Sequence, residues 1–333
     1  MNFKKYILFF VLSCSFNFAY GQDFHLSQYD AAALNVNPAL TGLFRGRLRI
    51  HGHYRNQWLK VADKPFTTAV AALDVNKGKW GIGGQIANFR AGQGGYNQIS
   101  ILPSLAYHKP LGKKKNSMLS VGAQIGAFQK TVNASSLTFA SQYVESNGGD
   151  FNTSLPSGEN FESNAIYNLD INLGVMYHYT NRYSRLNPFV GLTAYHLNNP
   201  KETFLGEVNR LPLRFQFQAG SRISLTKRIS LTPKVFIQYQ KSVEEITAGI
   251  LGHYHLKNPN FFLLYGGTYR SEKDAVIAEV GAKYGAFEGR FSYDINLSTL
   301  KGISNGRGAS EFSLTYIFNR PKVYPLEKCP KIP

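Results

Sequence analysis

The sequence has little cysteine and no long apolar run beyond its first residues. Its 333 residues include two cysteines, Cys14 and Cys329. Because Cys14 lies in a predicted leader, the mature chain keeps one thiol, which excludes an internal disulfide and a cysteine metal site. After the leader no apolar run approaches the roughly 18 residues that a transmembrane helix requires, so helical membrane spans are excluded.

Runs rich in Ala, Leu, Glu and Lys, which are typical of helices, are also missing. The abundant residues are Tyr (20), Phe (24) and Gly (31), and this composition favours strands and tight turns. Charged residues make up 17% of the chain, which is below the average of soluble domains. The composition therefore predicts an all-β protein.

Acidic residues are few. The chain has 20 Asp and Glu against 37 Lys and Arg, which gives a formal net charge of +17. The bases are scattered or sit in short turns such as Lys113–Lys115, and there is no basic helix, zinc-finger spacing or RNA-binding aromatic signature. The sequence therefore predicts no nucleic-acid partner, and we expect the charge to lie in a basic lumen or a basic rim beside the membrane.

Residues 1–21 have the pattern of a secretory signal peptide. Lys4-Lys5 form its positive region, Tyr6–Leu12 form the core of its apolar region, and Ala19-Tyr20-Gly21 supplies a small-x-small cleavage site. A second interpretation stays open, because Val11-Leu12-Ser13-Cys14 resembles a lipoprotein box that would leave a lipidated cysteine as the first residue.

The segment Phe312–Phe318, near the C-terminal end, alternates large apolar residues with Ser313, Thr315 and Ile317. Side chains on a strand point to opposite faces with a period of two, so the large residues share one face. An aromatic, alternating strand that finishes on Phe suits the closing strand of an outer-membrane β-barrel. The last strand of a soluble β-sandwich would show the same alternation.

The mature chain repeats one unit, an alternating strand followed by a turn. This pattern predicts a transmembrane antiparallel β-barrel over residues 45–318. About fourteen strands are expected, over 45–61, 65–76, 79–91, 94–108, 117–133, 165–180, 186–198, 209–224, 229–241, 243–256, 260–271, 274–284, 286–297 and 308–318.

The lengths of the predicted connections support the barrel over the sandwich. Extracellular loops of such barrels are longer than periplasmic turns. The three longest connections are all odd in order: 134–164, 199–208 and 298–307. The even ones are mostly tight.

Two further segments are expected in the periplasm. One is a lead-in over residues 22–44, and the other is a Pro-rich tail over 319–333. Four prolines in the tail oppose helix and sheet, so it should be extended. The tail is either inert or a docking segment for a periplasmic partner.

Three groups of residues resemble a known family. They are Asp23–Tyr29 with Leu34–Gly42, Tyr54–Trp58 with Pro65–Thr68, and Tyr293–Ile295 with Glu311–Leu314. Together they resemble the PorP/SprF family of the type IX secretion system of Bacteroidetes, over about residues 22–318. The resemblance implies an outer-membrane barrel that works with the secretion and gliding machinery and its periplasmic partners. It also implies a role in export or surface attachment of adhesins that carry a C-terminal sorting domain.

Two short stretches are candidate partner-binding or structural sites. The first is the turn of Asn35, Asn37 and Pro38, which would plug the barrel base or cap it. The second lies at the outer end of the first strand, where Trp would anchor at the lipid headgroups or a polar cluster would order the first loop or hold a partner. It consists of Arg55, Asn56, Gln57 and Trp58.

No catalytic constellation stands out, and the sequence predicts neither an enzyme nor a bound cofactor or metal. Glycines at 81, 83 and 84 precede no helix, so they indicate close packing or a bulge and not a phosphate loop. The residues considered for metal or acid–base chemistry are two period-two His pairs and three carboxylates: His51 with His53, His253 with His255, and Glu244, Glu245 and Asp294.

The sequence thus predicts a non-enzymatic barrel in the lipids of the cell outer membrane. As a component of type IX secretion and gliding, it would bind or anchor an exported adhesin. A passive porin or substrate-specific channel is the alternative, because a barrel of about fourteen strands could hold side chains and loops in its lumen or conduct a solute.

Overall fold

The computed structural model describes residues 23–319, apart from 59–63, 93–94, 134–136, 146–148, 160, 162, 182, 205–208, 259, 272–273 and 300. The predicted signal peptide, nearly all of the predicted tail and both cysteines lie outside the described residues. Within the described part, no helix has the length and apolarity needed to cross a membrane.

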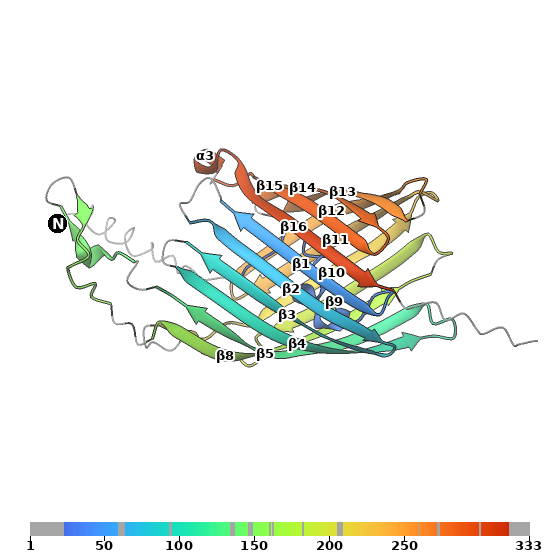
Figure 1. The fold of residues 1–333 in the computed structure, drawn as a ribbon, viewed down its shortest axis with the longest axis horizontal. Helices are drawn as coiled ribbons and strands as arrows, with labels where there is room; N and C mark the ends of the chain where they lie inside the picture. The colour runs from blue at the N-terminus through green and yellow to red at the C-terminus, as the bar shows by residue number, and fades with distance from the viewer. Residues whose placement is uncertain are drawn as a thin grey trace, which may run out of the picture.

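Fourteen antiparallel strands form one closed barrel, in which β1 pairs with β16 (Figure 1). This confirms the predicted fold class and strand number. The strands are β1 (Leu48–Gln57), β2 (Phe66–Lys77), β3 (Trp80–Ala91), β4 (Tyr96–Leu111), β5 (Ser117–Thr131), β8 (Ala165–Tyr179), β9 (Leu186–Tyr195), β10 (Arg214–Ser224), β11 (Ile229–Gln240), β12 (Val243–His255), β13 (Phe261–Arg270), β14 (Ala275–Tyr284), β15 (Phe287–Asn296) and β16 (Arg307–Phe318).

The closing strand has the alternation that its sequence predicts. Phe312 and Leu314 are 53% and 44% exposed on the outer surface, whereas Glu311 and Ser313 are buried inside. The outer face thus presents apolar side chains that lipid would solvate, and the inner face is polar. A soluble sandwich would instead bury the apolar face, so this arrangement identifies an outer-membrane barrel.

The long connections gather at one end of the barrel. There the β5–β8 connection carries η3 (Ala140–Gln142) and a small hairpin of β6 (Tyr143–Val144) with β7 (Asp150–Phe151), and the β15–β16 connection carries α3 (Lys301–Ser304). Figure 1 shows this end at the left. Because long loops face the cell exterior, we call it the outer mouth.

The opposite end holds the short turns and the start of β1 beside the end of β16, where Leu48 pairs with Phe318. We call it the periplasmic mouth. Two strands are shorter than expected at the outer mouth, since the strand predicted to residue 198 ends at Tyr195 and the strand predicted from residue 209 begins at Arg214. Pro212 lies in the missing part of the second of these strands, and it cannot donate a ladder hydrogen bond.

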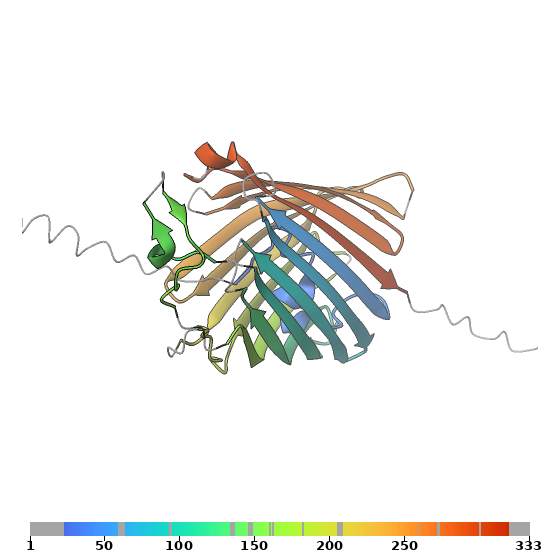
Figure 2. The same ribbon diagram turned by 60° about the vertical axis from the view of Figure 1, so that its left-hand side comes forward.

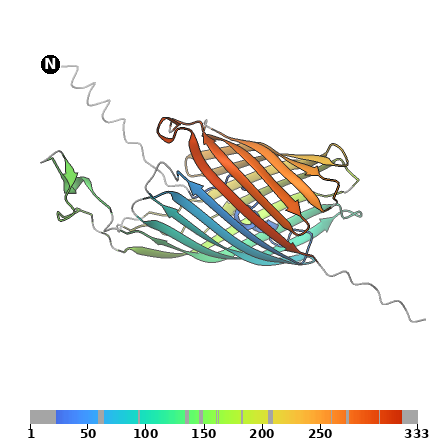
Figure 3. The ribbon, with the colours of Figure 1, turned by 45° about the horizontal axis from the view of Figure 1, so that its top comes forward.

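The chain before β1 lies inside the barrel. Residues 23–43, which we call the plug, include α2 (Ala33–Val36) and η1 (Pro38–Leu40). Figures 2 and 3 show this blue segment enclosed by the strands. The sequence predicted that the lead-in lies in the periplasm, but in the structure it lies inside the barrel. Its apolar and polar side chains are both buried against the inner wall.

Glycines in the wall make room for the plug backbone. A Cβ added at Gly81 would lie 1.9 Å from the Thr41 carbonyl oxygen, and one at Gly122 would lie 2.4 Å from the Pro38 carbonyl. No side chain tolerates such an approach. The sequence predicted close packing or a bulge at Gly81, and the structure shows that the partner in this close packing is the plug.

Candidate functional site: the plugged lumen

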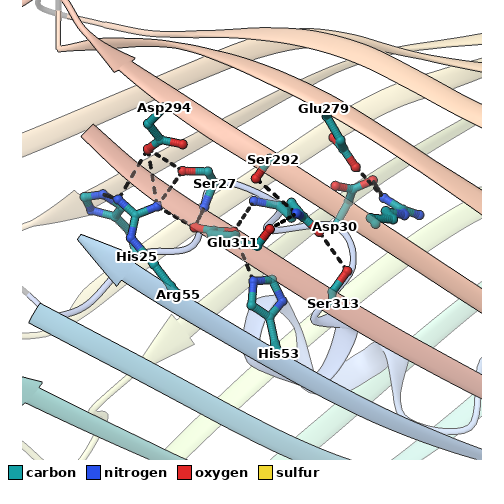
Figure 4. A network of polar contacts seen from close by, with 12 residues as sticks. His25, Ser27, Asp30, His53, Arg55, Glu279, Ser292, Asp294, Glu311 and Ser313 are labelled. Atoms are coloured by element: carbon teal, nitrogen blue, oxygen red, sulfur yellow. Dashed lines mark hydrogen bonds and ion pairs between the residues drawn. The ribbon is translucent and has the colours of Figure 1, made fainter. Parts of the chain in front are cut away.

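The carboxylate of Glu311 binds the plug backbone directly. Its two oxygens accept hydrogen bonds from the backbone N–H of Ser27 at 2.6 Å and of Gln28 at 2.9 Å, and it also pairs with the Arg55 guanidinium (Figure 4). Glu311 is 1% exposed and Arg55 is 3% exposed. The segment is thus held by a buried, charge-assisted network.

A second carboxylate, on Asp294, completes this network. It accepts a hydrogen bond from the Ser27 hydroxyl at 2.7 Å and lies 3.3 Å from Arg55 and 3.4 Å from Arg270. Both guanidinium groups also donate to the Ser27 oxygen, at 2.6 and 2.7 Å. We call Ser27, Arg55, Arg270, Asp294 and Glu311 the Arg55 cluster.

Two histidines flank the Arg55 cluster. His53 contacts Glu311 at 3.0 Å, and His25 of the plug contacts Glu245 at 3.3 Å. Burial, followed by the charges of Arg270 and Arg55, holds the pKa of His25 well below its usual value. These groups serve to hold the plug, and the described residues contain no group of three or more side chains suited to a metal ion.

The remaining candidate histidines lie elsewhere on the wall. His51 is bound to Thr315 at 2.9 Å. His253 and His255 are on β12, where the ring of His255 stacks on Phe262.

The first plug residue is held near the outer mouth. Asp23 pairs with His196 at 2.7 Å and with Arg214 at 3.1 Å, and the other ring nitrogen of His196 contacts Asp170 at 2.8 Å. Burial alone would lower the pKa of His196, but the two carboxylates raise it to about 9. Burial would raise the pKa of Asp23, but the charges of His196 and Arg214 hold it well below its ordinary value.

The middle of the plug contacts the wall through Asp30. Its carboxylate accepts from Lys234 at 2.7 Å and from Arg290 at 3.0 Å. Next to it, the ring of Tyr29 stacks on Phe236 with centroids 4.6 Å apart. An ion pair and an apolar contact therefore fix the same turn.

The predicted turn of Asn35, Asn37 and Pro38 lies within the plug. Pro38 starts η1, and the side chain of Asn37 caps it by accepting from the Ala39 N–H at 2.9 Å. The Asn37 amide also donates to the Val175 carbonyl at 3.1 Å, and the Asn35 carbonyl accepts from the Tyr195 hydroxyl at 2.9 Å. The turn is thus tied to β8 and β9.

Since Ser27 contacts β15 and β16 while Asn37 contacts β8, the plug spans the lumen between opposite walls. Its last residues are fixed near the periplasmic mouth, where Asp74 accepts from the Gly42 N–H at 2.6 Å and pairs with Arg49 at 2.7 Å.

The four candidate residues at the end of β1 do not form one cluster in the structure. Arg55 enters the cluster, and Gln57 accepts a hydrogen bond from it at 3.4 Å. Asn56 is half-buried. Trp58 adopts a left-handed backbone with φ of 63° and packs on Phe66 at 4.9 Å.

Phe66 shares the inward face of β2 with buried Thr68 and Val70. It also contacts Phe89, on which Phe24 of the plug stacks at 5.9 Å. Trp58, Phe66, Phe89 and Phe24 therefore form an aromatic group at the outer mouth, which we call the outer aromatic group.

Sequence reasoning missed the charged partners of Arg55. Glu311 lies 256 positions away from Arg55 along the chain, so no spacing rule links them. Two signals pointed toward them. Asp294 and Glu311 belong to the same set of family motifs as Ser27 and Arg55, and charged residues of alternating barrel strands are expected on the inward face.

The family model for the type IX secretion system membrane protein PorP/SprF matches residues 18–316. The chain belongs to the PorP/SprF family. No curated protein matches it. Nothing in the family or the fold indicates an enzyme, and membership associates the chain with the components of the secretion machinery.

Among solved structures, the toluene transporter TbuX of Ralstonia pickettii has a TM-score of 0.52 and 11% identity, covering 87% of this chain and 94% of its own. The monoaromatic hydrocarbon channel CymD has a TM-score of 0.50 and 13% identity, covering 90% and 95%. At these identities the similarity establishes the fold alone. With the family, it places the PorP/SprF chain in the outer membrane.

Replacing Glu311 by Gln removes the carboxylate charge but keeps the side-chain shape. We expect a loss of about 3–5 kcal/mol in the free energy of unfolding, because Arg55 is left without its nearest buried counter-charge. Urea unfolding in lipid vesicles, followed by tryptophan fluorescence, measures this, and amide exchange at Ser27 and Gln28 should accelerate. The matched control is Glu244→Gln, on an exposed carboxylate. Equal effects of the two changes would contradict a role for Glu311 in holding the plug.

The tie between Asp23 and His196 should depend on pH. The folded pKa of His196 lies above its unfolded value, so its contribution is complete below about pH 6.5 and is lost as pH rises through about 9,. The low pKa of Asp23 leaves its charge in place throughout that window. NMR titration of labelled histidine, assigned with His196→Gln, should give a raised pKa that falls in Asp23→Asn. The pKa should stay unchanged in Asp150→Asn, on the exposed hairpin; an unaltered value in Asp23→Asn would refute the assignment.

Proposed function

We propose that this PorP/SprF barrel is a non-enzymatic component that binds or anchors an exported adhesin at the cell surface. The observation that supports this most is the plug, which is hydrogen-bonded to opposite walls through Ser27 and Asn37. Its Asp23 and Asp30 also form ion pairs with Arg214 and Lys234 of the wall. A barrel with a filled lumen is a rigid platform, and its outer mouth can present a fixed surface to a partner. The proposed cargo element is the C-terminal sorting domain of the adhesin.

The outer aromatic group is the proposed contact for the cargo. Aromatic side chains supply much of the binding energy of protein interfaces. Here they lie beside the first plug residues, since Phe24 stacks on Phe89. The polar residues that we predicted to hold a partner are Arg55, Asn56 and Gln57. Of these, Arg55 would act by fixing the plug through Ser27.

Deleting the gene should abolish surface display of the adhesin. Wild-type complementation should restore it, and Trp58→Ala with Phe66→Ala should restore less than half, because a cargo contact is lost. The control is Trp80→Ala with Tyr107→Ala, another aromatic pair with centroids 4.9 Å apart. Immunofluorescence on intact cells measures display, and barrel levels in the membrane are checked for each strain. Normal display in the deletion strain would rule out the proposed function.

The alternative is a passive porin or substrate-specific channel, which fits the names of the similar barrels. The plug argues against steady conduction, since its side chains are buried among those of the wall. We expect no steady current from the wild-type barrel in planar bilayers and open-channel currents after deletion of residues 24–41. Steady currents from the wild type would favour the channel.

A further inference from the structure

A polar cavity of about 530 Å³ lies at the periplasmic mouth. It is bounded by Arg45, which follows the plug, by His178 and Phe189 on β8 and β9, and by Arg222 on β10. The remaining lining residues come from the ends of these strands and the β8–β9 connection. The volume falls within the range of about 300–1,000 Å³ that is typical of ligand pockets.

The cationic groups of this cavity have no counter-charge among the described residues. Neither Arg45 nor Arg222 has a hydrogen-bond or ion-pair partner among the described residues, and no lining residue is acidic. The Nδ1 atom of His178 is buried and also lacks a hydrogen-bond partner. By contrast, Arg55 and Arg290 in the lumen both pair with carboxylates. The cavity is thus complementary to an oxyanion, which guanidinium groups bind in a bidentate manner.

The surrounding rim carries the same sign of charge. The periplasmic connections contain no Asp or Glu. The outer β5–β8 connection is the reverse, with four acidic residues and no Lys or Arg. Charges of one sign around a mouth attract ligands of the opposite charge. Because the positive charges are spread over several connections, they suit a ligand with several negative charges. The described basic residues of the periplasmic connections are Lys79, Lys113, Lys114, Lys115, Arg185, Lys227, Arg228 and Lys257.

We propose that the periplasmic mouth binds an acidic peptide segment, one carboxylate of which enters the cavity between Arg45 and Arg222. His178, Phe189 and Arg222 share the inward face of their strands with the buried residues Met176, Gly191 and Gln218. These groups therefore face the lumen and not the lipid. The site is separate from the proposed cargo surface, which lies at the other end of the barrel.

Binding of a fluorescein-labelled hexaglutamate peptide to the full-length barrel in non-ionic detergent tests the proposal by fluorescence anisotropy. We expect saturable binding, no binding of hexaglutamine, and a loss of about tenfold or more in affinity for Arg45→Gln with Arg222→Gln. The control, Lys113→Gln with Lys114→Gln, makes the same charge change on the exposed rim and should cost less than about threefold. A heat-modifiable shift on gels checks the folding of each variant.

Equal losses in the two double variants would overturn the cavity as the binding site, because only the net charge would then matter. Calorimetry with inorganic phosphate at matched ionic strength separates the chemistries. Binding of phosphate without binding of hexaglutamate would overturn the acidic peptide as the ligand.

Discussion

The contact between the Glu311 carboxylate and the plug backbone is the interaction on which the rest of the lumen depends. Backbone N–H groups of the plug donate to other plug residues from Ala31 onward, so those of Ser27 and Gln28 need partners from the wall. Glu311 supplies two acceptors to consecutive N–H groups, and Arg55 compensates its charge. Because all these groups are out of contact with water, losing one would leave another buried and unpaired.

The two faces of the barrel wall meet different environments, lipid on the outside and a polar lumen on the inside. Lipid requires an apolar exterior, so the alternation of each strand puts its polar side chains inside. A lumen lined with charges of both signs then binds a segment with the complementary pattern. Asp23 and Asp30 of the plug therefore find Arg214 and Lys234 on different strands, and the plug is ordered along its whole length.

The two mouths differ in charge and in shape. The outer mouth carries the long, acidic β5–β8 connection and the outer aromatic group, while the periplasmic mouth has short basic turns. Such an asymmetry suits a protein that meets different partners on the two sides of one membrane. The net charge of +17 is therefore unevenly distributed, and the predicted basic rim lies at the periplasmic end.

The sequence by itself determined the barrel, because alternation is local: each strand shows its lipid face within a few residues, as Phe312–Phe318 does. It also identified the turn at Asn37 and Pro38, whose residue types specify their own backbone. Only the tertiary structure decided that the lead-in fills the lumen and that Arg55 meets Glu311 and Asp294. Those contacts join residues more than 200 positions apart, and their geometry exists only after the sheet has closed.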